Sequence, residues 1–125
     1  MNFDVYKAAV WLMWIALPTT AWNYWRAWDR LPARVAVHFD AHWQPNGYTS
    51  REAALMLALG IITFLLVVFT VGACIVRAQK PGASWSMLLM FYVSLAALWY
   101  ANNWIVTANL NLLVPHPPPL NLSVH

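Results

Sequence analysis

Charged residues are scarce in this sequence, and acidic residues are the scarcest. Only 9% of the positions are charged and 62% are hydrophobic, whereas about 25% of a soluble domain is normally charged. This composition excludes an ordinary soluble domain and indicates an integral membrane protein. The net charge of +3 comes from 7 basic and 4 acidic residues. It therefore reflects missing acids, and a basic surface for DNA or RNA is not expected.

Cysteine is almost absent, because Cys74 is the single example and lies inside an apolar run. One cysteine allows neither an intramolecular disulfide nor a thiolate metal cluster. We therefore expect helix packing in lipid to hold the fold, without redox chemistry at cysteine.

The sequence motifs of enzymes and cofactor sites are missing as well. There is no glycine-rich phosphate loop, no nucleophile elbow and no H-E-x-x-H pair in the chain. The 4 histidines lie outside the apolar runs, which excludes a histidine-ligated haem inside the membrane. We expect no enzymatic activity and no cofactor.

What the sequence does contain is long apolar runs, and a membrane-spanning helix needs about 20 apolar residues. Residues 8–25, 53–76 and 85–107 meet this need. We interpret the first run as a retained helix rather than a cleaved signal peptide, because tryptophans interrupt it, and Pro18 should bend it. We predict an all-α integral membrane protein with three transmembrane helices. A single membrane domain would cover residues 1–114, and a Pro-rich extended tail would cover residues 115–125.

Basic residues do not decide the orientation of these spans. Three spans place the two termini on opposite sides of the membrane, and the positive-inside rule compares the Lys and Arg residues on each side. One side holds Lys7, Arg77 and Lys80, and the other holds Arg26, Arg30, Arg34 and Arg51. The numbers of basic residues on the two sides are too similar for the rule to decide the orientation.

The polar loop between the first two spans, residues 26–52, has a pattern of its own. From residue 34 to 43 apolar and polar positions alternate, which predicts a half-buried extended segment. Pro45, Asn46 and Gly47 then predict a turn. Thr49 and Glu52 have the spacing of a capping box at the start of the next helix. We therefore expect an ordered, partly extended loop.

His38, Asp40 and His42 would project from one side of such an extended segment. Imidazole and carboxylate suit zinc, copper or nickel, so these residues are a candidate metal site. Arg34 on the same face would repel a cation, and a fourth ligand is not evident. The alternatives are a pH-sensitive loop and a polar face that hydrogen-bonds to the loop itself or to lipid headgroups.

Asparagines mark the last span. Asn102 and Asn109 recur along one helical face, and Asn103 lies beside them. Buried amides in membrane helices usually hydrogen-bond to neighbouring helices, in the same chain or in a partner. We predict a role for Asn102, Asn103 and Asn109 in helix–helix packing.

The loop motifs resemble a known family. The run Leu31-Pro32-Ala33-Arg34-Val35-Ala36-Val37-His38-Phe39, followed by Pro45-Asn46-Gly47-Tyr48-Thr49-Ser50-Arg51, is similar to the N-terminal domain of SdpI-type bacterial membrane proteins, a domain of unknown biochemical function. The resemblance covers about residues 8–75. Ala36 replaces a usual proline and Trp43 a usual glycine, so the fine geometry of the loop can differ.

The resemblance implies a multi-pass protein of the bacterial cytoplasmic membrane. The N-terminus would lie inside, loop 26–52 outside, residues 77–84 inside and the C-terminus outside. In the best-known branch such proteins give immunity against a secreted peptide toxin and signal its presence. The larger relatives have more spans than the three predicted here.

Our leading hypothesis is a non-enzymatic SdpI-like protein that recognises a peptide toxin, a lipid or another ligand through residues 31–51. The recognition residues would be Leu31, Pro32, His38, Phe39, Asn46, Gly47, Tyr48 and Arg51. The alternative is a small accessory subunit of a larger membrane complex, or a homo-oligomer, because three helices alone bury little surface. A third hypothesis is a metal-binding membrane protein that uses His38, Asp40 and His42.

Overall fold

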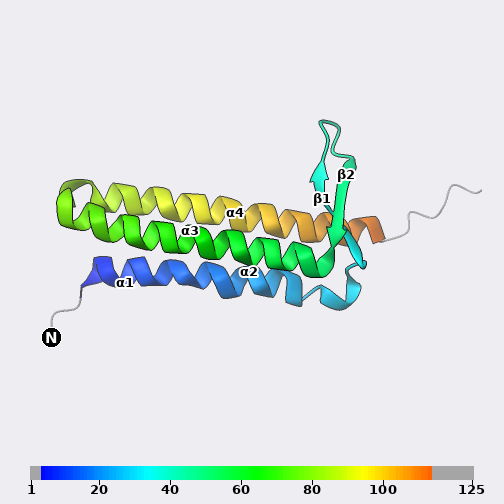
Figure 1. Ribbon diagram of the computed structural model, residues 1–125, viewed down its shortest axis with the longest axis horizontal. Helices are drawn as coiled ribbons and strands as arrows, with labels where there is room; N and C mark the ends of the chain where they lie inside the picture. Colours follow the sequence, from blue (N-terminus) through cyan, green and yellow to red (C-terminus); the bar gives the residue numbers. More distant parts are fainter. Residues whose placement is uncertain (1–3, 114–125) are drawn as a thin grey trace, which may run out of the picture.

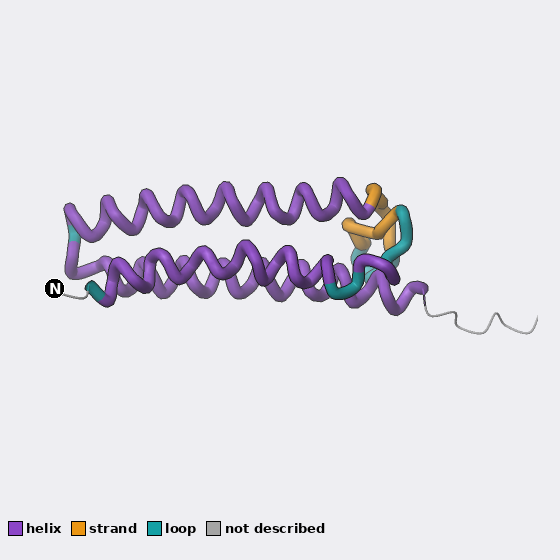
Figure 2. The backbone as a smooth tube through the Cα atoms, turned by 90° about the horizontal axis from the view of Figure 1, so that it is seen from below, coloured by secondary structure: helices purple, strands orange, loops and turns teal. Residues whose placement is uncertain are grey.

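The computed structural model describes residues 4–113 and shows three helical stretches side by side with a β-hairpin at one end (Figure 1). Viewed at a right angle, α3 lies on one side and the other two stretches lie together on the opposite side (Figure 2). The elements in chain order are α1 (Val5–Leu12), η1 (Met13–Ile15), α2 (Ala16–Trp25), η2 (Trp28–Arg30), β1 (Arg34–Phe39), β2 (Pro45–Ser50), α3 (Arg51–Gln79), η3 (Pro81–Ala83) and α4 (Ser84–Leu113). The predicted tail, residues 115–125, lies outside the described residues.

The first helical stretch consists of α1, η1 and α2 in direct succession. Asp4 caps its start, since its carboxylate accepts a hydrogen bond from the backbone N–H of Lys7 at 3.2 Å. The tighter η1 turn directly precedes the turn that contains Pro18, which has no N–H to donate to the residue four positions earlier. The predicted disturbance at Pro18 therefore takes the form of a 3₁₀ turn between two short α-helices.

The helices α3 and α4 have the length and composition of membrane spans. Their most apolar windows have mean hydropathies of 2.8 and 1.4, and only 22% and 17% of these windows are buried inside the protein. A core helix of a soluble protein would be mostly buried, whereas these helices expose large apolar side chains such as Phe64, Val71, Leu89 and Met90. Two helices are thus long and apolar enough to cross a membrane. With 8 and 10 residues, α1 and α2 are each too short to do so alone.

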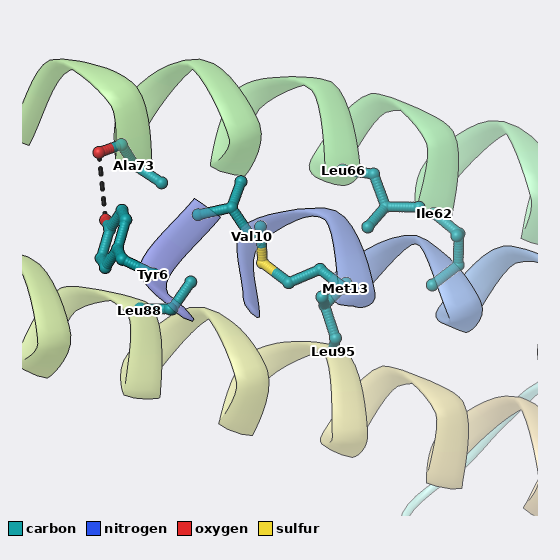
Figure 3. Close-up of a cluster of buried hydrophobic side chains, with 8 residues drawn as sticks. All are labelled: Tyr6, Val10, Met13, Ile62, Leu66, Ala73, Leu88 and Leu95. Carbon is teal, nitrogen blue, oxygen red and sulfur yellow. Dashed lines mark hydrogen bonds between the residues drawn. The ribbon is translucent and has the colours of Figure 1, made fainter. Parts of the chain in front are cut away.

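Two buried clusters hold the three stretches together. The larger cluster lies between α1, η1, α3 and α4 and consists of Tyr6, Val10, Met13, Ile62, Leu66, Ala73, Leu88 and Leu95 (Figure 3). Within it, the Tyr6 hydroxyl donates to the backbone carbonyl of Ala73 at 3.0 Å. The second cluster lies at the hairpin end and consists of Tyr24, Ala27, Leu31, Val35, Ala54, Ala58 and Val106. It joins the base of the hairpin to the helices.

The hairpin differs from the prediction in the position of its turn. Pro45 and Gly47 belong to β2, and the reversal lies in residues 40–44. The Asp40 carboxylate closes this loop by accepting hydrogen bonds from the backbone N–H groups of His42 at 2.8 Å and Gln44 at 2.9 Å. Trp43 has a φ of 61°, the left-handed conformation that the loop requires. The predicted turn at Pro45-Asn46-Gly47 is therefore wrong.

The predicted alternation of faces is also only partly correct. The extended segment does begin at Arg34, but Val35 and Ala36 are both buried, at 1% and 0% exposure. Ala36 is the exception, because Asn109 of α4 covers its backbone. Val37, His38 and Phe39 keep the predicted alternation, although the register of the two strands shifts on either side of His38. The strand ends at Phe39, so the residues after it do not continue its faces.

The N-cap of α3 lies one residue later than predicted. The Ser50 hydroxyl accepts a hydrogen bond from the backbone N–H of Ala53 at 3.0 Å, whereas Thr49 is still part of β2. The carboxylate of Glu52 contacts the guanidinium group of Arg51 at 3.4 Å. The predicted Thr49–Glu52 capping box is therefore wrong, because strand β2 runs directly into the helix.

Candidate functional site: the hairpin end of the bundle

Arg51 ties the loop before the hairpin to the first turn of α3. Its Nη1 donates to the backbone carbonyl oxygens of Trp28 at 2.9 Å and Leu31 at 3.4 Å. Its guanidinium carbon lies 4.7 Å from the centre of the Trp28 ring, a cation–π contact. Because the side chain contacts carbonyls at the start of η2 and directly after it, Arg51 fixes the path of the chain there.

Asn109 of α4 holds the outer edge of β1. Its Oδ1 accepts from the backbone N–H of Ala36 at 2.7 Å, and its Nδ2 donates to the Ala36 carbonyl at 2.8 Å. The same Nδ2 reaches the Ile105 carbonyl within α4 at 2.8 Å. Asn109 is 2% exposed, so these bonds are shielded from water. The amide therefore satisfies two buried backbone groups that an edge strand would otherwise leave open.

The other two predicted packing asparagines have different partners. The Asn102 amide donates to the Leu98 carbonyl in its own helix at 3.1 Å. Asn103 Oδ1 accepts from Arg26 Nη2 at 2.7 Å, which links α4 to the residue that follows α2. Only Asn103 of these two makes a hydrogen bond between helical stretches.

His38 and Gly47 lie opposite each other in the hairpin. A Cβ atom at Gly47 would be 2.9 Å from the Cβ of His38, so a larger residue does not fit without a shift. Beside this pair, His38 Nδ1 hydrogen-bonds to Asn46 Oδ1. Gly47 is thus required by a close approach of the strands, where the sequence had indicated a turn.

Aromatic side chains hold the tip of the hairpin against α4. The ring of Phe39 meets Trp104 edge-on with 4.9 Å between centroids, and Trp43 lies 5.5 Å from the same ring. A shallow cavity of about 290 Å³ adjoins this cluster and is lined by Phe39, Trp43, Gln44, Pro45, Trp104, Thr107, Ala108 and Asn111. The hairpin is therefore anchored at its base and near its tip.

The outer edge of β2 is open. Because both backbone polar groups of Ala36 point to Asn109, the Ala36–Tyr48 pair is of the type without mutual hydrogen bonds. The N–H and C=O of Tyr48 consequently face away from β1. Elsewhere in residues 4–113 no backbone group hydrogen-bonds to them. Exposure alternates along β2, so Asn46 and Tyr48 present exposed side chains beside this edge.

The structure does not assemble the predicted metal site. Asp40 Oδ1 is engaged by two backbone N–H groups of the loop, and His38 pairs with Asn46. Within residues 4–113 no group of three His, Cys, Asp or Glu side chains could hold a metal ion. His42 lies in the loop beyond the end of β1. The physical reason is that β1 ends at Phe39, so the three residues do not share one strand face.

The predicted recognition residues fall into two groups. Leu31 is buried in the second hydrophobic cluster and Pro32 is half-buried, while Phe39, Gly47 and Arg51 contact other parts of the protein. His38, Asn46 and Tyr48 are exposed. The anchors Trp104 and Asn109 were not predicted as part of this site. A local pattern could reveal only that both lie on an uncharged helix next to other asparagines.

Residues 13–62 match the model of a protein family described as a domain of unknown function (DUF1648). The matched segment extends from η1 into α3 and contains the complete hairpin. No curated protein and no solved structure matches the chain. The region that carries the loop motifs is therefore the region that is similar to this family.

Proposed function

We propose that this chain is a non-enzymatic, three-span protein of the bacterial cytoplasmic membrane that recognises an extended peptide outside the cell through its hairpin. This places it beside the SdpI-type immunity and sensor proteins that its loop motifs resemble. The hairpin, the loop before it and the end of α4 form the outer end of the molecule. The start of α1 and the η3 turn form the inner end.

A third span is supported by the combined length of α1, η1 and α2. Residues 5–25 form helical turns without a gap, and about 1.5 Å per residue gives them a length of roughly 30 Å, the thickness of the hydrocarbon core. Lys7 and Arg26 lie at the two ends of this stretch. It runs alongside α3 and α4 (Figure 1) and shares the larger hydrophobic cluster with them.

The observation that carries the peptide proposal is the open edge of β2 on an anchored hairpin. A peptide in extended conformation can pair with the outward N–H and C=O of Tyr48 and so add a third strand. Arg51, Asn109 and Trp104 hold the hairpin in place before any ligand arrives. Little conformational entropy would then be lost on binding, which favours affinity.

Exposed side chains beside the open edge can supply specificity. Tyr48 is 51% exposed and Asn46 is exposed on the same face of β2. An aromatic and an amide side chain beside the open strand edge suit a peptide that carries apolar and polar side chains in alternation.

The alternative function, an accessory subunit of a membrane complex, is favoured by a different surface. An open cavity of about 500 Å³ between α2, η2 and α3 is lined by Pro18, Ala21, Trp22, Trp25, Trp28, Leu55 and Leu59. Trp22 and Trp25 are 59% and 73% exposed. A helix of another subunit could cover this face, and the hairpin would then be a docking element.

Peptide panning tests the proposal directly. The full chain in lipid nanodiscs is presented with a phage library of random peptides about ten residues long, a length that pairs with one strand edge. Selected peptides should bind the wild type and bind Tyr48→Pro at least about 10-fold more weakly, since proline removes the outward N–H. Tyr48→Ala keeps that N–H and should lose less affinity. Ala41→Pro, in the exposed loop, is the matched proline control and should bind as the wild type does.

Two results would overturn the proposal. One is a selection that yields no peptide that binds at the hairpin. The other is equal binding by wild type and Tyr48→Pro. Recovery of the tagged chain from its own membranes with a constant set of other subunits, in fixed stoichiometry, would instead support the accessory-subunit function.

A further inference from the structure

A second candidate site lies at the opposite end of the bundle, between α1 and α3. A groove of about 360 Å³ there is lined by the cations Lys7 and Arg77, by Asp4, and by largely apolar side chains that include Val10, Trp11 and Cys74. The groove therefore has a charged part and an apolar part. Neither part belongs to the hairpin site.

Positive charge predominates at this end of the protein. Lys7, Arg77 and Lys80 lie here, whereas Asp4 is the one acidic residue at this end, because Asp29, Asp40 and Glu52 lie at or near the hairpin. Asp4 Oδ1 is engaged as the N-cap of α1. Among residues 4–113 the single salt bridge joins Arg51 to Glu52. Lys7 and Arg77 thus have no acidic partner in the described part of the chain.

Arg77 is held in position with hydrogen-bonding capacity to spare. Its guanidinium carbon lies 4.6 Å from the centre of the Tyr6 ring, and its Nη1 donates to Ser84 Oγ at 3.0 Å. The Tyr6 ring is itself fixed by the bond from its hydroxyl to the Ala73 carbonyl. A guanidinium group has five N–H donors, so most of them remain for an anion.

We propose that this groove binds the headgroup phosphate of an anionic phospholipid. Lys7 and Arg77 would contact the phosphate, and an acyl chain would follow the apolar wall formed by Trp11 and Cys74. The inference rests on the membrane arrangement of the proposed function, because that arrangement places both cations at headgroup level on the inner side. Basic pockets between membrane helices are suited to anionic headgroups.

The apolar wall distinguishes a lipid from free phosphate. Trp11 is 57% exposed, and Val71 and Ile75 on the adjoining surface of α3 are 53% and 49% exposed. Free phosphate would gain only the charged contacts, whereas a phospholipid also covers apolar surface. Charge and shape together therefore favour a lipid as the occupant.

Native mass spectrometry of the full chain in detergent tests this inference with phosphatidylglycerol and phosphatidylcholine as probes. The wild type should retain phosphatidylglycerol in preference to phosphatidylcholine. The double variant Lys7→Gln with Arg77→Gln should bind phosphatidylglycerol about 10-fold or more weakly, since two charged hydrogen-bonding groups are removed. The matched control removes the same charge at the hairpin end, as Arg30→Gln with Arg34→Gln, and should bind phosphatidylglycerol like the wild type.

Further arms keep the result decisive. Arg77 also supports Tyr6 and Ser84, so Lys7→Gln alone is measured as well, because the Lys7 side chain makes no hydrogen bond within residues 4–113. It should still lose several-fold in phosphatidylglycerol affinity. Equal retention of both lipids, or displacement of phosphatidylglycerol by millimolar inorganic phosphate, would overturn the lipid site. Tyr48→Pro should bind the lipid normally, which separates a failure here from a failure of peptide recognition.

Discussion

The side-chain amide of Asn109 pairs with the backbone of Ala36 on both its N–H and its C=O, as a neighbouring β-strand would. Asn109→Asp keeps the acceptor and loses both Nδ2 donors, so a buried carbonyl is left facing a carboxylate. We expect a cost of about 1–3 kcal/mol for the unpaired group, and more if the carboxylate stays ionised. Thermal unfolding in detergent measures this cost, and hydrogen exchange at the Ala36 amide reports whether losing the carbonyl bond opens the edge of β1.

Asn102→Asp is the matched control for this prediction. Asn102 lies on the same helical face and is also buried, at 7% exposure, but its amide bonds only to the Leu98 carbonyl of its own helix. It should lower the unfolding temperature without releasing the Ala36 amide. If both variants exchange that amide at the same rate, the bond from Asn109 Nδ2 to the Ala36 carbonyl does not hold the edge of β1.

Gly47→Ala should destabilise the hairpin because the new Cβ would be 2.9 Å from the Cβ of His38. Overpacking of this kind costs about 1–3 kcal/mol. His38→Gly removes the opposing Cβ, so the double variant should regain most of the stability that Gly47→Ala loses. A double-mutant cycle on hairpin exchange protection measures this coupling. Additive effects of the two substitutions would contradict the steric explanation.

The helices α3 and α4 could be predicted from the sequence because a long apolar run imposes a simple physical requirement. An uncharged apolar run of sufficient length must satisfy its backbone internally, so it forms a helix. The predicted runs 53–76 and 85–107 fall within α3 and α4. The extended segment beginning at Arg34 could be predicted for a similar reason, since alternation reports one buried face.

The details of the hairpin could not be predicted, because distant or competing contacts decide them. Asn46-Gly47 is a strong local turn signal, but both residues lie in β2. The Asp40 carboxylate instead closes the loop formed by residues 40–44. The Asn109–Ala36 bonds join residues 73 positions apart, and no local pattern contains that information. Within β1 the predicted alternation fails at Ala36, which is buried because Asn109 of α4 bonds to its backbone, and it ends at Phe39 where the strand ends.

Arg51→Lys should loosen the loop between α2 and β1. A lysine keeps the charge but lacks the planar group that reaches the carbonyls of Trp28 and Leu31 and lies over the Trp28 ring. Trypsin should then cut after Arg30 several-fold faster than in the wild type, because proteolysis follows local opening.

Glu52→Gln provides the control for the Arg51 prediction. It removes the exposed ion pair with Arg51 and leaves the carbonyl contacts in place, and exposed pairs contribute about 0–1 kcal/mol. Its cleavage rate should stay close to that of the wild type. Equal acceleration in both variants would assign the effect to the ion pair.

Trp104→Ala should release the tip of the hairpin while leaving the bundle intact. It removes the ring that contacts both Phe39 and Trp43, and aromatic pairs contribute about 0.5–1.5 kcal/mol each beyond the area they bury. The amides of Asp40 and Trp43, which bond within the loop, should exchange roughly 10-fold faster. Peptide binding at β2 should weaken as well, since a mobile edge must be ordered on association.

Trp99→Ala is the matched control for that substitution, because Trp99 and Trp104 both lie on α4 and are both 36% exposed. Trp99 differs in its surroundings, since it lines a groove against the first helical stretch. It should lower the unfolding temperature by packing loss alone and leave loop exchange and peptide affinity unchanged. If Trp104→Ala instead frees the loop without weakening the peptide, then anchoring the tip serves stability and not recognition. The open edge near Tyr48 would then have to act through the base of the hairpin, where Asn109 holds Ala36.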